Sequence, residues 1–404
     1  MARDPQTETR VRLTRSLRIP HPERLARLKR VPELGPRLLF FSGGSALRRC
    51  CQALIGRTHN SIHLITPFDS GGSSAVLRKA FHMPAVGDLR NRLLALADRS
   101  IKGQPEIFRL LAFRFPGDGE QRRLGAWLRR MADGREPMVT AVRDPMRKII
   151  RNHLRFFIEQ APAGFDLRGA NVGNLVLTGG YLNQNRHLDP VCFLFSKLVE
   201  VRGVVRPVAS KNLHLVTELA DGQTLVGQHR LTGKQLAPIE SPVERIYLSR
   251  RKKRPEPYVL PVRDKVGWQV GQADLICYPI GSFYSSLVVN LLLAGMGAAV
   301  AASPALKVYV PNTGGDPEQL GLALDGQVRA LLEALRRDEN RRLDTEQLLQ
   351  YVLVDPVMAR AERGPLRAVA KLGVEVIEVP LVSEASSPWI DPGWLADVLV
   401  SLVG

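Results

Sequence analysis

Residues 36–45 read PRLLFFSGGS and residues 61–74 read SIHLITPFDSGGSS, and these two stretches decide the fold. Each places an apolar run, with the length of a buried strand, directly before a loop of glycine and serine. Between the two stretches, apolar residues recur at helical spacing from Leu47 to Leu54. A strand, a tight loop, a helix and a second strand in this order predict a parallel sheet with right-handed crossovers.

The remaining sequence suggests how the domain is organised. Residues 1–35 are polar and basic, so we expect an N-terminal extension, followed by an α/β domain over 36–404. Residues 88–200 contain no convincing strand, which predicts a helical insertion at about 100–200. Strand-like runs around an Asp-Gly turn then indicate a small β-hairpin region. From residue 273 strands and helices alternate again, and the apolar stretch 284–302 reads as one buried helix.

The chain carries a formal net charge of +18, and part of its basic excess is concentrated. Residues 1–30 and the run from Arg250 to Arg254 are the two basic segments. Such runs attract polyanions, so nucleic-acid binding is one interpretation. A solvated tail and a basic loop are the favoured interpretation. No aromatic residues interleave the runs, as platforms for single-stranded nucleic acid require, so nucleic acid is not the favoured partner.

The cysteines and the hydropathy pattern bear on the compartment. All four cysteines lie in apolar segments without a CxxC pair, which indicates buried thiols in a reducing environment. No segment reaches the roughly 20 apolar residues of a membrane helix, and no secretory pattern opens the sequence. We therefore expect a cytoplasmic protein that does not interact with a membrane.

Glycine- and serine-rich loops follow several of the predicted strands. Since parallel strands end at one edge of a sheet, these loops should converge where ligands bind. Glycines let the backbone approach phosphate oxygens, and a helix start offers unpaired N–H groups. Each loop alone also reads as a tight turn or a helix cap. The candidate phosphate- and nucleotide-binding residues on these loops are Gly43, Gly44, Ser45, Gly71, Gly72, Ser73, Ser74, Gly87, Asn91, Gly281, Ser282, Ser285 and Asn312.

Two carboxylates accompany the second and third loops. Asp69 opens the segment DSGGSS, and Asp88 lies in the segment GDLRN at 87–91. Brought near one phosphate group, the pair would suit Mg²⁺, which takes a few oxygen ligands together with substrate phosphate. Asp69 and Asp88 are thus the candidate catalytic and metal-binding residues. No metal-ligand spacing for zinc, no dinucleotide GxGxxG after the first strand and no P-loop occurs, so zinc, haem and flavin are not expected.

The order of these motifs resembles the superfamily of the gluconeogenesis factor YvcK and the 2-phospho-L-lactate transferase CofD. The resemblance rests on the segments just quoted and on Asn171-Val172-Gly173-Asn174-Leu175, running from about residue 37 to 315. Within the superfamily, the chain looks most similar to the CofD-like proteins of the bacterial GAK system. The resemblance implies a Rossmann-like three-layer core and adds Asn174 to the ligand-facing residues.

The resemblance also implies two functions that stay open. In the transferase branch, a guanylylated phospholactate donates its phospholactyl group to a deazaflavin alcohol with Mg²⁺ and releases GMP. In the YvcK branch, members bind UDP-sugars and regulate carbon and cell-wall metabolism. The leading hypothesis is therefore a Mg²⁺-dependent phosphotransfer protein that binds a GDP- or UDP-type ligand, and the alternative is a non-catalytic UDP-sugar-binding regulator. Whether the chain acts as a monomer or a homodimer is likewise open.

Overall fold

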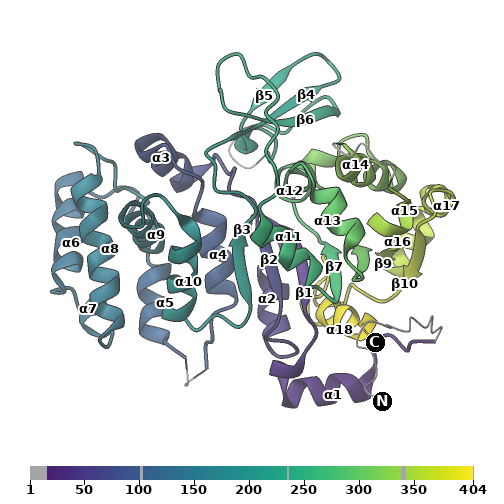
Figure 1. The fold of residues 1–404 in the computed structure, drawn as a ribbon, viewed down its shortest axis with the longest axis horizontal. Coiled ribbons are helices and arrows are strands. Elements are labelled where there is room, and N and C mark those ends of the chain that lie inside the picture. The colour runs from purple at the N-terminus through teal and green to yellow at the C-terminus, as the bar shows by residue number, and fades with distance from the viewer. Residues whose placement is uncertain (1–15, 101–102, 234–235, 338–342, 404) are drawn as a thin grey trace, which may run out of the picture.

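A computed structural model describes residues 16–100, 103–233, 236–337 and 343–403 (Figure 1). Its centre is a seven-stranded, wholly parallel sheet in the order β10-β9-β8-β7-β1-β2-β3. The strands are β1 (Leu38–Ser42), β2 (Ile62–Ile65), β3 (Val204–Pro207), β7 (Leu275–Tyr278), β8 (Leu306–Tyr309), β9 (Tyr351–Val354) and β10 (Glu375–Glu378). The predicted parallel sheet is confirmed.

The sheet separates two hydrophobic cores, and alternate residues of each strand point into one or the other. In β1, Leu38 and Phe40 belong to one buried cluster, whereas Leu39 and Phe41 belong to the second. All four side chains are fully buried. This two-sided burial explains why β1 reads as an unbroken apolar run and not as an alternating pattern.

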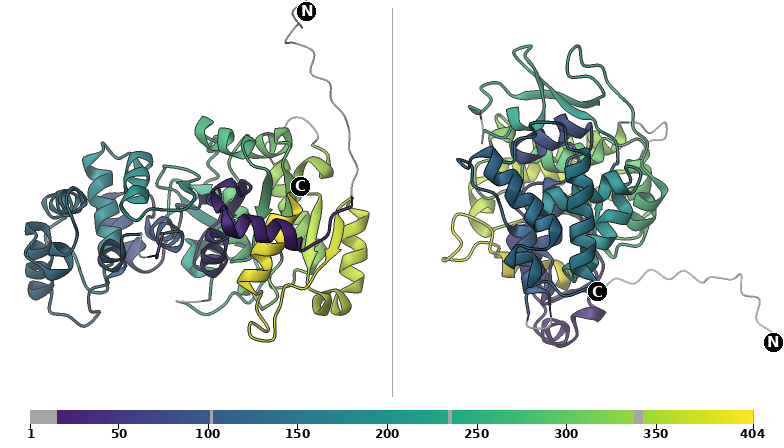
Figure 2. Two further views of the ribbon diagram at one scale, coloured as in Figure 1. Left: turned by 90° about the horizontal axis from the view of Figure 1, so that it is seen from below. Right: turned by 90° about the vertical axis from the view of Figure 1, so that its left-hand side faces the viewer.

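Helices cover both faces of the sheet (Figure 2), which confirms the three-layer prediction. One face packs against α1 (Pro22–Arg30), α2 (Arg48–Ile55), α4 (Gly87–Ala95) and α18 (Pro392–Leu402). The other packs against α11 (Asp264–Gly271), α13 (Met296–Ala302), α14 (Leu324–Arg336), α15 (Thr345–Leu348), α16 (Pro356–Ala361) and α17 (Arg363–Lys371). The structure describes no helix that is both long and apolar enough to cross a membrane.

Helix α1 lies within the stretch that we expected to extend from the domain. Its Leu25 and Leu28 are buried in the cluster that α18 also contributes to, and its charged residues remain outside. The His21 amide is also tied to α18, because it donates to Ser401 Oγ at 3.0 Å. Residues 1–15, with the first part of the basic run, lie outside the described residues.

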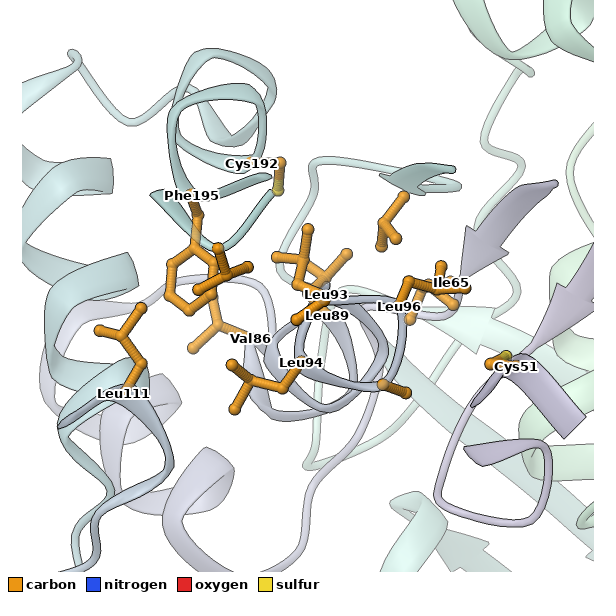
Figure 3. Packing of buried hydrophobic residues seen from close by; sticks show 14 of the residues in the cluster. Cys51, Ile65, Val86, Leu89, Leu93, Leu94, Leu96, Leu111, Cys192 and Phe195 are labelled. Carbon is orange, nitrogen blue, oxygen red and sulfur yellow. The ribbon is translucent and has the colours of Figure 1, made fainter. Parts of the chain in front are cut away.

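The segment between β2 and β3 is helical, as predicted, and forms the group of helices at the left of Figure 1. It contains α5 (Pro105–Ala112), α6 (Gln121–Asp133), α7 (Pro137–Thr140), α8 (Met146–Gln160), α9 (Val172–Asn183) and α10 (Leu188–Leu198). Helix α4 joins this group to the sheet. In Figure 3 its leucines lie between Ile65 on the sheet side and Leu111 and Phe195 on the side of the insertion.

A small antiparallel sheet stands beside the main one and corresponds to the predicted hairpin region. Its order is β5-β4-β6, with β4 (His214–Leu219), β5 (Thr224–Val226) and β6 (Val243–Ser249). The expected single helix over 284–302 is wrong. A π-helical segment (Phe283–Val288) runs into α12 (Val289–Leu291), and α13 starts afresh because Gly295 takes a left-handed conformation at φ 82°.

Candidate functional site

Three of the predicted loops meet at the carboxyl edge of the sheet and enclose a cavity of about 300 Å³. The first loop follows β1, the second connects β2 with α3 (Gly72–Phe81), and the third begins α4. The predicted residues that line the cavity are Gly44, Ser45, Asp69, Gly71, Gly72, Ser73, Ser74, Gly87, Asp88, Asn91 and Asn174. The structure therefore brings together residues that follow the carboxyl ends of β1 and β2, residues at the start of α4, and Asn174 of the helical insertion.

The first loop turns sharply because its glycines leave no room for side chains. A Cβ atom at Gly43 would lie 2.5 Å from Thr66 Cγ2, closer than any tolerated contact. Gly44 adopts φ 57°, a left-handed conformation that favours glycine. Gly43 itself is buried behind the loop and does not line the cavity, whereas Gly44 and Ser45 do.

The second loop is folded by its own carboxylate. Asp69 Oδ1 accepts a hydrogen bond from the Gly71 amide at 3.0 Å, which forms a local turn before α3. Ser73 Oγ accepts from Asn174 Nδ2 at 3.0 Å, so α9 of the insertion is linked to the start of α3. Asn174 is almost fully buried, and its Oδ1 has no hydrogen-bond partner among the described residues.

A buried arginine fixes the second loop from behind. The Arg78 guanidinium donates through Nη1 to the carbonyl oxygens of Phe68 and Asp69, both at 2.8 Å. Its Nε and Nη2 donate to Asn212 Oδ1 at 3.1 and 2.8 Å, and Nη2 also donates to the Leu213 carbonyl. Only 5% of Arg78 is exposed. One side chain thus joins the loop to the segment before β4, and no local sequence pattern marked it.

The third loop packs directly on the second. A Cβ at Gly87 would lie 2.5 Å from Ser74 Oγ and 3.8 Å from Asp69 Oδ2, so a larger residue here would displace the Ser74 hydroxyl. Asp88, the next residue, lines the same cavity in the first turn of α4. The two predicted acids therefore come from touching segments.

This pair of carboxylates fits the ligand preference of Mg²⁺. Magnesium is usually held by one or two carboxylates together with waters and substrate phosphates, and does not need a cage of protein ligands. No group of three or more histidine, cysteine, aspartate or glutamate side chains suited to a metal occurs among the residues that the structure describes. Asp69 and Asp88 would hold such an ion only together with a ligand's oxygens.

Sequence reasoning did not assign roles to five further residues of the cavity wall, which are Arg90, Arg114, Gln228, His229 and Thr232. Burial, chiefly, and the neighbouring Arg114 lower the pKa of Arg90 to about 10, so its guanidinium stays charged at neutral pH. Arg114 is exposed and follows α5, near the start of the insertion. The two cations give the cavity an anion-binding character.

His229 reaches the cavity from the turn after β5. Its Nδ1 lies 2.8 Å from Ser70 Oγ, which ties the small antiparallel sheet to the second loop. Desolvation, with the nearby cations Arg230 and Lys252, lowers the pKa of His229, so the imidazole is neutral at pH 7. Lys252 belongs to the basic run 250–254, so that run lies close enough to the cavity rim to act on His229.

The remaining predicted residues, Gly281, Ser282, Ser285 and Asn312, do not line this cavity. The amides at the start of their helical segment are already used, because Phe283 N donates to Asp316 Oδ2 at 2.8 Å. Tyr284 N and Ser285 N donate to Glu318 Oε2 at 2.9 and 2.8 Å, and the Ser285 hydroxyl donates to Oε1. Asn312 holds the Gly281 peptide group through bonds to its N–H and its carbonyl. Carboxylates thus occupy the positions that a phosphate would need.

Glu318 makes the stability of this region depend on pH. Burial, chiefly, and the neighbouring Asp316 raise its pKa from 4.5 to about 7. A carboxyl group whose pKa is higher in the folded state than in the unfolded state stabilises the fold. This stabilisation is fully present at a pH below the unfolded-state pKa, and it is lost as the pH rises through the folded-state pKa. We expect the free energy of unfolding to fall by about 3 kcal/mol from this group between roughly pH 4.5 and 8.

The variant Glu318→Gln tests that expectation, measured by urea unfolding across this pH range. Glutamine imitates the protonated acid, since its carbonyl can accept from both amides while its NH₂ faces the Ser285 hydroxyl. The variant should therefore lose most of this pH dependence. An unchanged pH profile in Glu318→Gln would show that another group is responsible.

Two histidines near the second loop in sequence, His63 and His82, lie outside the cavity. His63 is fully buried in β2, stacks on Phe40 with ring centroids 4.9 Å apart and lies 3.1 Å from Ser61 Oγ. His82 is exposed at the end of α3 in a left-handed conformation and does not line the cavity. The four cysteines are buried thiols, as predicted.

Comparison with known proteins agrees with this architecture. The family model of the 2-phospho-L-lactate transferase CofD matches residues 38–382. The gluconeogenesis factor of Listeria monocytogenes is 26% identical over 281 residues, which cover 69% of this chain and 67% of that protein. A putative gluconeogenesis factor of Deinococcus radiodurans is 30% identical over 305 residues, covering 75% of this chain and 52% of that protein.

A solved structure has the same fold. It is a crystal structure of a member of the UPF0052 family from Bacillus halodurans. It superposes with a TM-score of 0.63 at 21% sequence identity and covers 90% of this chain and 99% of that chain. Because the match covers 90% of this chain, the similarity extends beyond the parallel sheet to most of the helices and loops around it.

Proposed function

We propose, since this chain belongs to the 2-phospho-L-lactate transferase CofD family, that it binds a nucleotide-diphosphate-linked ligand and transfers a substituted phosphate group from it. One observation carries the proposal. Three glycine-containing loops, two carboxylates and two guanidinium groups converge on one cavity at the carboxyl edge of a parallel sheet. This is the edge at which open α/β sheets bind phosphorylated ligands.

Charge explains why the cavity suits a diphosphate. Arg90 and Arg114 supply positive charge at the wall, and the helix start at Gly72 contributes backbone N–H groups. The buried Oδ1 of Asn174 and the hydroxyls of Ser45 and Ser74 add polar contacts. Asp69 and Asp88 alone would repel a phosphate, so their presence in the same wall favours a ligand bound together with Mg²⁺.

The reaction class that this arrangement serves is displacement at phosphorus. An acceptor hydroxyl oxygen forms a bond to the phosphorus of the substituted phosphate, and the anhydride bond to the nucleotide phosphate breaks. A nucleoside monophosphate leaves with the electron pair of that bond, and the hydroxyl proton passes to a base. His229, neutral and at the rim, is the candidate base. Bound Mg²⁺ would neutralise charge on the phosphate oxygens, and Arg90 would hold them in position.

Ligand-induced stabilisation tests the binding step. Thermal unfolding of the full chain with GDP, UDP, ADP and UDP-N-acetylglucosamine, each with and without MgCl₂, should show a Tm rise of about 3 °C at a hundredfold excess over Kd. The rise should depend on magnesium, because the two carboxylates otherwise oppose the diphosphate. Inorganic sulfate at equal ionic strength serves as the control. No Mg²⁺-dependent rise with any nucleotide would contradict the proposal.

The relatives named gluconeogenesis factor favour a second candidate function. In that case the chain binds a UDP-sugar in the same cavity without turnover and acts through partner contacts. The two candidates differ in one measurement. The protein is incubated with a nucleotide-linked donor, an alcohol acceptor and Mg²⁺, and the products are separated by chromatography. Release of nucleoside monophosphate supports transfer. Tight binding of UDP-sugar without any release supports the regulator.

A further inference from the structure

A second cavity, of about 440 Å³, lies on the other side of β1 along the same edge of the sheet. Its wall comes from the start of α2, from the ends of β7 and β8 and from the segment before α18. The residues that line it include Ala46, Arg49, Ile280, Asn312, Ser387 and Trp389. Asn312, which the sequence assigned to the ligand, belongs to this cavity and not to the first.

The two cavities share one loop. Gly44 and Ser45 line the first cavity, and Ala46, the next residue, lines the second. On the facing side, a Cβ at Gly281 would lie 3.7 Å from the Ala46 side chain, so the loops after β1 and β7 touch. The sheet reverses its strand order between β1 and β7, because the chain passes to β2 and β3 on one side and to β8, β9 and β10 on the other. In open α/β sheets, ligands bind in the crevice that such a reversal forms beyond the carboxyl ends of the strands.

The wall of the second cavity carries an exposed aromatic ring held in place. Trp389 is 60% exposed, although an indole normally buries most of its surface. Its ring rests on the backbone of Gly314, where a Cβ would lie 2.0 Å from the indole Cζ3. The Thr313 hydroxyl donates to the Pro388 carbonyl at 2.7 Å and ties the two segments together. The ring is therefore a fixed, solvent-facing platform.

Polar groups complete the wall beside this platform. Arg49 of α2 is exposed at the cavity and makes no ion pair in the structure as described, and Ser387 is exposed beside Trp389. An apolar platform with a few polar groups at its edge matches a heteroaromatic ring, which offers a π face and hydrogen-bonding atoms around its rim. The volume is within the range of pockets that hold small organic ligands.

We infer that the nucleobase of the ligand stacks on Trp389 in the second cavity, while its phosphates cross the loop at 44–46 into the first. This inference rests on the nucleotide binding proposed above and specifies where the nucleoside lies. The reversal of strand order provides the crossing, and the shared loop connects the two cavities. A ligand with phosphates alone would leave Trp389 uncovered, so the second cavity is the reason to expect a nucleotide and not a simple phosphate ester.

Comparing ligands with and without a base tests the inference. Affinities of wild type and Trp389→Ala for GDP, UDP and inorganic pyrophosphate, all with Mg²⁺, are measured by calorimetry. We expect Trp389→Ala to weaken binding of the preferred nucleotide by about tenfold or more, the usual effect of losing a base-stacking ring. Pyrophosphate binding should not change. Trp389→Phe should keep most of the nucleotide affinity, and Trp268→Ala, an exposed tryptophan outside both cavities, is the matched control.

Each other outcome has a definite meaning. Unchanged nucleotide affinity in Trp389→Ala overturns the inference while the proposed function stands. An equal loss of affinity for the nucleotide and for pyrophosphate in Trp389→Ala also overturns the inference, because Trp389 would then affect binding through the fold. An altered oligomeric state of Trp389→Ala in light scattering, with nucleotide affinity unchanged, would assign the ring to contacts with a second copy. If wild type binds neither nucleotides nor pyrophosphate, the proposed function fails and the inference fails with it.

Discussion

Replacing Asp88 with alanine should abolish the Mg²⁺ dependence of ligand binding and of any turnover. Asp88 lines the cavity beside Asp69. On the proposed role of these two carboxylates, the loss of one would leave Mg²⁺ without half of its protein ligands. Even partners of metal ligands cost 10–100-fold when removed, so we expect a loss of about a hundredfold in Mg²⁺-supported affinity. Titration of nucleotide at fixed MgCl₂ and in EDTA measures the change.

The fold should survive this substitution. Helix α4 is anchored by Leu89 and Leu93, both fully buried, and not by Asp88 alone. Asp88→Asn keeps the shape and removes only the charge, so it should behave like Asp88→Ala in the titration. Asp133→Ala, an exposed acid at the end of α6, is the control. Retained Mg²⁺-dependent binding in both Asp88 variants would remove this residue from the site.

Replacing Arg78 should cost both stability and ligand binding. Arg78→Met preserves much of the side-chain volume but leaves the carbonyl oxygens of Phe68 and Leu213 without this donor. Buried polar groups that lose their partner cost 1–3 kcal/mol each, so we expect about 3 kcal/mol or more in urea unfolding. Nucleotide affinity should also fall, since the loop that begins at Asp69 is no longer held.

The conservative variant separates charge from geometry. Arg78→Lys keeps the positive charge, but an ammonium group cannot reach both Asn212 and the two loop carbonyls as a planar guanidinium does. Arg78→Lys should therefore lose most of the stability and nucleotide affinity that Arg78→Met loses. Lys79→Met, the exposed neighbour on α3, is the control and should match wild type in both measurements. A stable Arg78→Met with normal affinity would contradict this interpretation.

The parts of the site that follow directly from strands were predictable. The loops after β1 and β2 each contain paired glycines, and the rule that parallel strands end at one edge places them together. The third loop follows α3, so this rule does not place it, and its packing against Ser74 is a tertiary contact. The three-layer sheet was predictable for a similar reason, because strands buried on both faces read as unbroken apolar runs.

The rest depends on contacts between segments far apart in the sequence. His229 reaches Ser70 from a turn about 160 positions later, and Arg114 comes from the insertion, so no local pattern could assign them. Ser285 shows the opposite case. Its loop has the same local pattern as the first, but the pattern does not reveal that Glu318, beyond the next strand, takes its amide hydrogens.

The long separation between paired strands also affects how the chain acquires its structure during synthesis. β1 is central in the sheet, yet its partner β7 begins only at Leu275. In the same way, β2 pairs with β3, which begins at Val204. Contacts this distant in sequence make folding slow, and uncovered strand edges promote aggregation in the meantime. On the ribosome, one edge of β1 therefore remains unpaired until more than half of the polypeptide has emerged.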